Sequence, residues 1–559
     1  MKLEALKSVE IKGIEIPALV EVPNFADANK LSDRIFGAFC RINPELPCME
    51  DSKFIKNVFT CIKSAGGKDL TVNKDLVNFV KTDKEIAKWR KWYAEEKAKK
   101  AEYRKLHKDE IKKEADEKKA LYGTVLLNGV EEPLASWVIE SEGIFFGRGD
   151  SPINGFWKKA TTPSEVIVNT NSKNLPVLIT DKNKTSKFDW NVVWEPNSHF
   201  AAQYNIEIGI PNPDGTLKTK KSTKYKMIQF SAMSSVKKEG QSKKYAAATE
   251  LGKSYDKIIE NVKNDFTKIR EGKRVDGSTA VAVFMLFEKG IRIGFSGATV
   301  NGTKGLLALD WGKDVKRIDN KIKFDFYGKD SVRDTSSIET EFADVIEKVW
   351  SKYGKLATDK PTIKAYITRL APAVGDVFSP KLCRTAVAAS VMTKALEAVT
   401  AKYKLTENSN DALKKLAFDE ANMEVARRLN HQRGVSKAAA AKRNEAEKEK
   451  EKALKEREAK VKELKEKRLE RIETLKGKKG TREKIAKLKE QIKKSDERIT
   501  QAKRNLKFKK ENGDITGATS KASYIDPSIV AEWCSKVNLP IEKVYSKSQM
   551  KQFSQFFEN

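Results

Sequence analysis

The segment GATSKASYIDPSIVAEW, residues 517–533, decides how the rest of the chain is interpreted. It is compact and apolar, and it follows a stretch, residues 437–511, that consists mostly of Lys, Glu, Arg and Ala. Asp526 is expected to cap a helix and Pro527 fits the first helical position, so Tyr524 lies just ahead of a helix start. The return from a charged spacer to an apolar segment with a lone tyrosine predicts that this tyrosine joins a site built from residues far upstream.

The charged spacer itself predicts an antiparallel helical hairpin. In its second half, apolar residues recur at alternating steps of three and four, which is the spacing of a coiled-coil seam. These residues are Ile485, Leu488, Ile492, Ile499, Ala502 and Leu506. The first half repeats the pattern less strictly, and GKKG at 477–480 separates the two halves. A hairpin brings its two ends back together. The alternative is a disordered tail, which the regular seam disfavours.

Upstream of the spacer, the apolar period changes along the chain. Residues 121–235 contain short β-branched runs bounded by turn residues, which predict a β-rich region. Residues 86–120 predict one long, highly charged helix, and the period is helical again from about residue 245. Within that later part, Ile322, Phe324 and Phe326 alternate with polar neighbours and predict a strand. The expected fold class is therefore α+β with several domains.

The charge of the chain points to an acidic partner. The formal net charge is +31 over 559 residues, and an excess of this size favours nucleic acid. The alternative is a Lys-rich protein whose surface carries both signs of charge. An anionic membrane is disfavoured because no strongly amphipathic basic helix with an aromatic face stands out, and no apolar run approaches the length of a membrane span.

Cysteine, histidine and glycine patterns limit the cofactors. The five cysteines form no CxxC pair and read as reduced thiols of an intracellular protein. With three histidines in all and no acidic cluster at metal-ligand spacing, no metal site is expected. The sequence GATVNGTK at 297–304 has the glycine spacing of a P-loop, but its Thr and Lys stand in the wrong order. No cofactor, ATP included, is therefore expected.

Six short motifs stand out in order along the chain. They are GIFFGRGDSP (143–152), EKGIRIG (288–294), FDFYGKDSVR (324–333), LCRTAVAAS (382–390), NHQRGVSK (430–437) and TSKASYIDP (519–527). In order, spacing and local sequence they resemble the eukaryotic-type DNA topoisomerase IB family. EWCSKVNLPIEKVYSKSQ (532–549) continues the resemblance almost to the end of the chain.

The resemblance implies four domains and one partner. It implies a β-rich N-terminal cap that clamps DNA (1–236) and a mainly α catalytic core (237–436) of the tyrosine recombinase/topoisomerase IB type. An antiparallel coiled-coil linker (437–512) and a small α C-terminal domain with the nucleophilic tyrosine (513–559) would follow. The partner is double-stranded DNA, around which a monomer would close, and no membrane is involved.

The resemblance also implies the site residues, carried over by position. The catalytic set is Arg292, Lys329, Arg384, His431 and Tyr524. The DNA contacts are Arg148, Asp330, Thr519, Gly328 and Thr385. The chain departs from the family at Ser523, where the family has Asn, and at FSGATVNGT (295–303), which lacks the family's acidic, Asn-containing loop.

These residue types suit phosphodiester chemistry without a metal. A phenol oxygen can attack a DNA phosphate and form a 3′-phosphotyrosine, which keeps the ester's energy so that religation needs no ATP. Arg292 and Arg384 would bear the charge of the transition state, and His431 would add a hydrogen bond. Lys329 would protonate the leaving 5′ oxygen, although a lysine that only contacts phosphate is the alternative.

The predicted function is that of a type IB DNA topoisomerase, an isomerase that relaxes supercoiled DNA. It would do so by single-strand cleavage, controlled rotation and religation, without ATP or metal. Two other functions stay open at this point: a tyrosine site-specific recombinase, and a non-catalytic DNA-binding scaffold. The expected setting is intracellular and DNA-associated, nuclear if the source is eukaryotic, with viral, archaeal and organellar settings also open.

Overall fold

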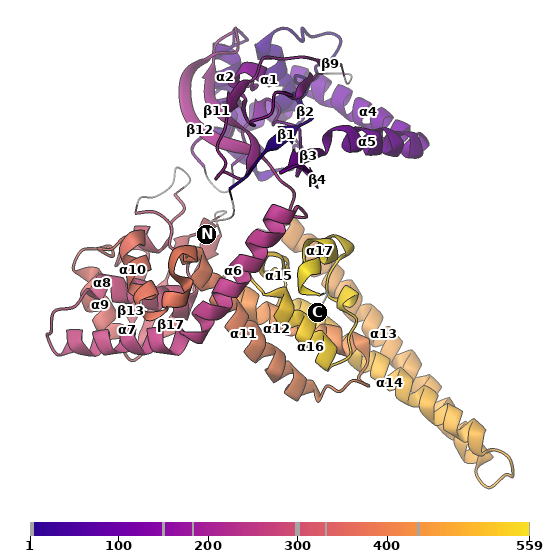
Figure 1. Cartoon of the computed structure of the whole chain (residues 1–559). Coiled ribbons are helices and arrows are strands. Elements are labelled where there is room, and N and C mark those ends of the chain that lie inside the picture. The colour runs from indigo at the N-terminus through magenta and orange to yellow at the C-terminus, as the bar shows by residue number, and fades with distance from the viewer. Residues whose placement is uncertain are drawn as a thin grey trace. The chain divides into compact units, whose positions relative to one another are not determined.

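The computed structural model describes residues 5–147, 151–180, 184–296, 302–329, 332–432 and 437–557. It divides into two compact units (Figure 1). The first comprises Met1–Lys243 with Ala298–Thr303, and the second comprises Lys244–Gly297 with Lys304–Asn559. The first is rich in strands, and the second is mostly helical. Among the described residues, no helix has the length and apolar character needed to cross a membrane.

The first unit is organised around a long antiparallel hairpin. The strands of this unit are β1 (Val9–Ile11), β2 (Gly13–Glu15), β3 (Thr124–Leu127), β4 (Val130–Pro133), β5 (Gly143–Ile144), β6 (Trp157–Lys158), β7 (Ile167–Asn169), β8 (Val177–Ile179), β9 (Thr185–Ser186), β10 (Asn191–Val193), β11 (Phe200–Pro211) and β12 (Leu217–Gln229). The hairpin consists of β11 and β12. One sheet has the order β10-β7-β11-β6-β5, with β12 paired to β11. Two three-stranded sheets have the orders β1-β3-β4 and β2-β8-β9.

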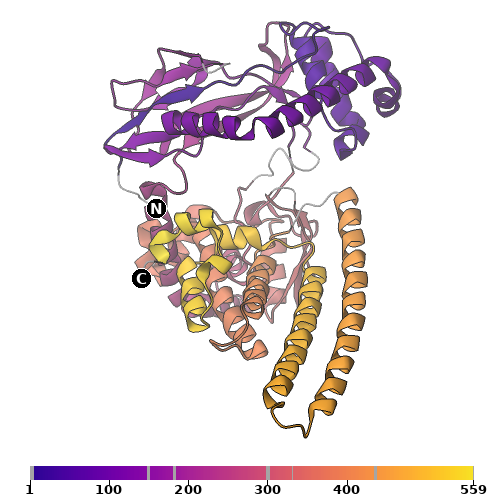
Figure 2. The same cartoon turned by 90° about the vertical axis from the view of Figure 1, so that its right-hand side faces the viewer.

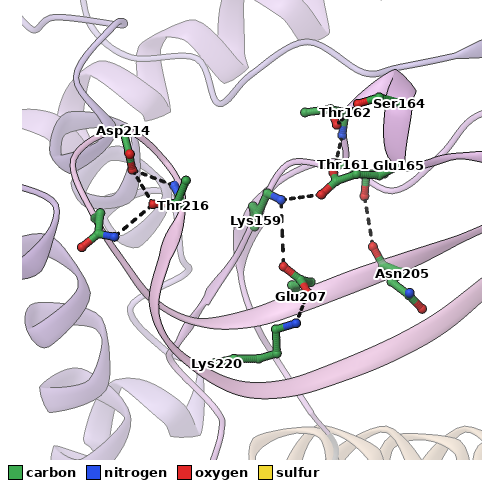
Figure 3. Close-up of polar contacts among 11 residues, drawn as sticks. Lys159, Thr161, Thr162, Ser164, Glu165, Asn205, Glu207, Asp214, Thr216 and Lys220 are labelled. Carbon is green, nitrogen blue, oxygen red and sulfur yellow. Dashed lines mark hydrogen bonds and ion pairs between the residues drawn. The ribbon is translucent and has the colours of Figure 1, made fainter.

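Local chemistry explains the hairpin. Its turn contains Gly215 at φ +88°, a left-handed conformation that favours glycine. Asp214 accepts hydrogen bonds from the backbone N–H of Thr216 at 2.9 Å and from its hydroxyl at 2.6 Å (Figure 3). Along the strands, Glu207 of β11 pairs with Lys220 of β12 and lies 3.9 Å from Lys159. These contacts hold the register of β11 against its neighbours.

The helices of the first unit contain one departure from the sequence prediction. They are α1 (Leu31–Cys40), α2 (Ser52–Ser64), α3 (Leu76–Thr82), α4 (Lys84–Leu106) and α5 (Lys108–Tyr122). The prediction of a single helix over 86–120 is wrong, because the helix is interrupted at His107 (φ −107°, ψ 31°). The His107 ring contacts Glu110 at 2.7 Å, and Asp109 and Glu110 occupy the first turn of α5. Acidic side chains at a helix N-terminus favour a new start there.

From residue 235 onward, helices dominate. They are α6 (Ser235–Lys253), α7 (Tyr255–Arg270), α8 (Gly277–Phe284), α9 (Ala343–Ser351), α10 (Lys360–Leu370), α11 (Pro380–Tyr403), α12 (Asp411–Arg428), α13 (Lys437–Leu475), α14 (Arg482–Glu511), α15 (Gly517–Ser523), α16 (Pro527–Lys536) and α17 (Lys547–Gln552). A continuous buried cluster joins α6–α12 with Tyr524, Ile525 and α16. The predicted N-cap of α16 is confirmed, since the Asp526 side chain accepts a hydrogen bond from the N–H of Ser528.

Short strands extend this second unit. They are β13 (Val315–Ile318), β14 (Lys321–Phe324), β15 (Phe326–Tyr327), β16 (Arg333–Asp334) and β17 (Ser337–Glu339). The predicted alternation is confirmed, because Ile322, Phe324 and Phe326 are all buried. The strand breaks at Asp325, so β15 leaves the sheet and pairs with β16 instead. The residues between β15 and β16 include Lys329.

The two long helices α13 and α14 lie side by side (Figures 1 and 2). The loop between them contains Gly477 and Gly480, both at positive φ. The apolar residues of α14 that the sequence analysis named are half-buried, while most of their neighbours are exposed. Lys465 of α13 pairs with Asp496 of α14 at 2.6 Å. A narrow apolar contact with charged flanks therefore joins the two helices.

Candidate active site

Tyr524 follows α15 directly and is 5% exposed. Its backbone N–H donates to the carbonyl of Ser520 at 2.9 Å. The Ser520 hydroxyl donates to Asn422 of α12 at 2.6 Å, and the Asn422 amide donates to the carbonyl of Gly517 at 3.1 Å. Because all of these side-chain groups are buried, the short helix that precedes the tyrosine is held in one place on α12.

His431 comes just after the C-terminal end of α12, where its N–H donates to the carbonyl of Ala426 at 2.8 Å. The carbonyl of His431 accepts from the N–H of Thr516 at 2.9 Å, and Gln432 forms a β-bridge with Ile515. The chain before α13 is thus bonded to the chain after α14. As a result, the His431 and Tyr524 rings lie next to each other, with centroids 5.2 Å apart.

Arg384 lies on α11 and is 3% exposed. Its two terminal nitrogens donate to the carbonyls of Gly290 and Leu429, the second at 2.9 Å, and these bonds fix the plane of the guanidinium. The guanidinium carbon lies 5.2 Å from the centroid of the Tyr524 ring. Its Nε atom has no hydrogen-bond partner among the described residues. A buried cation therefore faces the phenol.

The cations and the burial set the protonation of the two rings. Burial acts to raise the pKa of Tyr524, but the positive charges of Arg384 and Arg292 outweigh it, so the pKa lies below the usual 10.0. Burial lowers the pKa of His431 from 6.5 to about 3, and repulsion from the two arginines adds to this. His431 is therefore neutral at pH 7. Neither of its ring nitrogens has a partner among the described residues.

Burial also lowers the pKa of Arg384, from 12.5 to about 10, and repulsion from Arg292 contributes. The backbone of Arg292 is held by a hydrogen bond from the N–H of Leu306 to its carbonyl at 2.8 Å. Arg292, Arg384, Lys304 and Lys329 line one small pocket, whose other charged lining residues are Lys289, Arg428 and Asp334. Lys329 is exposed and Arg292 is half-buried. Positive residues therefore outnumber the one carboxylate, that of Asp334, in the lining of this pocket.

The predicted catalytic residues thus fall into two groups. Arg384, His431 and Tyr524 are buried against one another, whereas Arg292 and Lys329 border the adjoining pocket. Within the described parts of the chain, no three His, Cys, Asp or Glu side chains come together as a metal-binding group.

The predicted DNA contacts are more scattered. Arg148 and Asp330 lie outside the described residues. Thr519 is exposed on α15, and Gly328 donates its N–H to the carbonyl of Val332 at 2.8 Å. Thr385 is fully buried, so its contact with DNA stays a prediction.

Sequence reasoning missed two lysines near the tyrosine. Lys244 donates to the carbonyl of Ser523 at 3.1 Å, and burial with repulsion from Lys381 lowers its pKa from 10.5 to about 7. The positive charge of Lys381 also acts to lower the pKa of Tyr524. Lys381 stands three residues before Arg384 on α11, and this helical spacing is a signal that sequence analysis had available. Nothing in the local sequence singles out Lys244.

Three family models cover successive parts of the chain. Residues 29–209 match the model described as "Eukaryotic DNA topoisomerase I, DNA binding fragment". Residues 233–467 match "Eukaryotic DNA topoisomerase I, catalytic core". Residues 496–555 match the "C-terminal topoisomerase domain".

The chain belongs to the eukaryotic-type DNA topoisomerase IB family. Among relatives in this family, DNA topoisomerase 1 beta of Arabidopsis thaliana is 27% identical over 482 residues, which are 83% of this chain and 48% of the relative. Human DNA topoisomerase 1 is 25% identical over 482 residues, 80% of this chain and 57% of the relative. For the human enzyme named DNA topoisomerase I, mitochondrial, the identity is 26% over 464 residues, 80% of this chain and 72% of that family member. The chain thus spans about half the length of the first two relatives.

Proposed function

We propose that this protein is a type IB DNA topoisomerase that relaxes supercoiled DNA without ATP or a metal ion. One observation carries the proposal: a buried phenol, Tyr524, lies next to both a fixed guanidinium, Arg384, and a neutral imidazole, His431. The positive charges lower the pKa of the phenol, which favours its reactive anion. Membership of the topoisomerase IB family supports the same activity.

The cleavage step exchanges one phosphate ester for another. The Tyr524 oxygen forms a bond to phosphorus while the bond from phosphorus to the 5′ oxygen of the next nucleotide breaks. The phenol loses its proton to solvent, and the departing 5′ oxygen gains one. The product is a 3′-phosphotyrosine and a 5′ hydroxyl. Because the number of phosphate esters is unchanged, attack by the 5′ hydroxyl reseals the strand without an energy source.

The buried side chains would stabilise the transition state. Attack on phosphorus increases the negative charge on the non-bridging oxygens, and preorganised donors lower the free energy of that charge. Arg384 and Arg292 supply guanidinium donors at the site. Neutral His431 supplies one ring N–H. Its ring nitrogens have no hydrogen-bond partner among the described residues, so this N–H is available to a non-bridging oxygen of the phosphate.

Lys329 is the proposed general acid. It is exposed at the edge of the pocket that Arg384 and Arg292 also line, so it borders the place where a phosphate would sit. An ammonium that donates its proton to the 5′ oxygen turns a poor leaving group into an alcohol.

The remaining parts of the chain would serve DNA binding and rotation. In this proposal, residues 1–236 are a cap and residues 237–436 the catalytic core of a monomer clamped around the duplex. Residues 437–512 form a coiled-coil linker that slows rotation of the nicked DNA, and residues 513–559 carry the nucleophile. Contacts with DNA are assigned to Arg148, Gly328, Asp330, Thr385 and Thr519, and the setting to DNA inside the cell, in the nucleus.

Relaxation of a supercoiled plasmid in EDTA without ATP tests the proposal. We expect the wild type to relax the plasmid and Tyr524→Phe to bind it without relaxing it. Tyr545→Phe is the matched control, because Tyr545 is equally buried and its hydroxyl has no partner among the described residues. This control should relax DNA like the wild type.

Peptide mapping of protein trapped on cleaved plasmid gives the second readout. A nucleotide adduct on Tyr524 supports the proposal, and an adduct elsewhere contradicts it. Strand exchange between two defined sites would instead indicate a recombinase. Binding without any change of topology would indicate a scaffold.

A further inference from the structure

The hairpin that carries Lys329 has little support of its own. Among the described residues, its strands β15 and β16 pair at Phe326 with Asp334 and at Tyr327 with Arg333, and the N–H of Gly328 adds one bond to the carbonyl of Val332. A ladder of this length is marginal in water. The ion pair of Arg333 with Asp325, at 2.8 Å, is exposed and contributes little. The position of an exposed lysine on such a hairpin must therefore be set by contacts with the core.

One buried ion pair makes such a contact. Lys289, at the end of the π-helical turn η4 (Met285–Lys289), lies 3.0 Å from a carboxylate oxygen of Asp334. The side chains are 7% and 5% exposed. The other oxygen of Asp334 accepts from the N–H of Ser336 at 3.1 Å and from its hydroxyl. The base of the hairpin is thus bonded to the core segment that leads through Gly290 to Arg292.

Stability alone does not account for this pair. Removing two charges from water is costly, and apolar side chains of similar volume often stabilise a core equally well or better. An ion pair does fix the relative position of its two side chains, because its hydrogen bond is satisfied in only one arrangement. Burial lowers the pKa of Lys289 while Asp334 opposes this lowering, so Asp334 favours the charged lysine.

We propose that the Lys289–Asp334 ion pair is a positioning pair that holds the Lys329 hairpin at the distance needed for proton transfer to the leaving 5′ oxygen. The inference rests on the proposed function, since it assigns a task within strand cleavage. Asp334 is five residues beyond Lys329 and directly opposite Phe326 in the ladder. A shift of the hairpin base on the core therefore displaces the lysine.

The test compares two DNA substrates that differ in the leaving group. One has oxygen at the 5′ bridging position of the scissile phosphate, and the other has sulfur. An alkyl thiol has a pKa of about 8.5, so it leaves as the anion and needs no proton donor. A variant with a misplaced general acid therefore cleaves the oxygen substrate more slowly than the wild type does. It cleaves the sulfur substrate at a rate close to that of the wild type.

The central variant is Lys289→Met/Asp334→Leu, which leaves no buried charge unpaired and should fold. We expect its single-turnover cleavage of the oxygen substrate to be about 10²-fold slower than that of the wild type, the loss typical of a small misplacement. Cleavage of the sulfur substrate should change little. Asp334→Asn, which keeps the shape of the side chain, should show the same pattern.

A double-mutant cycle with Lys329→Ala completes the test. If the pair acts through Lys329, adding Lys289→Met/Asp334→Leu to the Lys329→Ala variant should hardly lower its cleavage rate on the oxygen substrate any further. Additive losses, or equal losses on both substrates, would overturn the proposal. So would an unchanged rate on the oxygen substrate.

Two controls separate other causes. Lys414→Met removes a second buried lysine of the same unit, one that donates to the carbonyls of Glu407 and Asn538. It should lower the melting temperature without changing the ratio of the two cleavage rates. If wild-type protein cleaves neither substrate, the proposed function fails, and the positioning role falls with it.

Discussion

Arg384 and the lysines of α13 and α14 carry the same charge in opposite surroundings. Arg384 is 3% exposed and bonded to two backbone carbonyls, and its charge alters the pKa of both Tyr524 and His431. Lys465 of α13 also has a partner, Asp496, but their side chains are 40% and 47% exposed. The difference shows that desolvation and fixed geometry, rather than charge itself, determine what a cation does to its neighbours.

The largest effect is expected at the buried cation. Arg384→Gln removes a donor to the transition state, so single-turnover cleavage should fall by about 10²- to 10³-fold. Loss of the positive charge also raises the pKa of Tyr524, so the remaining activity should shift to higher pH. Rates measured from pH 6 to pH 10 check both statements. Arg498→Gln, on the exposed surface of α14, is the matched control and should cleave normally.

The next effect concerns stability and pH. The pKa of His431 is about 3 in the folded protein against the ordinary histidine value of 6.5, so the unfolded chain binds more protons between these limits. Stability should therefore fall as the pH drops below 6.5, with His431 contributing on the order of 3 kcal/mol of that loss at pH 4. His431→Gln should show a shallower fall in melting temperature over this range. Parallel curves for the two proteins would contradict the pKa.

Removal of the paired helices α13 and α14 is expected to have a smaller effect on activity. Replacing residues 438–510 by a short linker is feasible because the flanking segments are bonded through His431 and Thr516. We expect an unchanged cleavage rate but less processive relaxation with an altered response to salt, since a basic rod beside the DNA would slow its rotation. Time courses on supercoiled plasmid at several salt concentrations measure this. Identical time courses would remove the role in rotation.

The smallest effect is expected for one exposed ion pair. Lys465→Ala and Asp496→Ala should each change the free energy of unfolding by less than about 1 kcal/mol, with a coupling energy of about 0.2–1 kcal/mol or less. Thermal denaturation of the single and double variants measures the coupling. A coupling energy of several kcal/mol would erase the contrast with the buried site.

The sequence predicted correctly those features that depend on residues close together in the chain. The cap at Asp526 and the alternation of Ile322, Phe324 and Phe326 depend on residues a few positions apart, and both were predicted correctly. The break at His107 was missed, because a charged helix carries too weak an apolar pattern to mark an interruption. The catalytic residues came from resemblance to a family, since a lone Tyr, His or Arg has no local signature.

The residue types of this protein, the periods of its helices and strands, and its family follow from the amino-acid sequence alone. Three contacts instead depend on how distant segments fold together: His431 lies against Tyr524, Arg384 is anchored to two carbonyls, and Lys289 meets Asp334. Local sequence patterns reflect backbone and side-chain geometry within a few residues. Desolvation, by contrast, depends on which distant segments close over a charge, and this burial is what makes the charges effective.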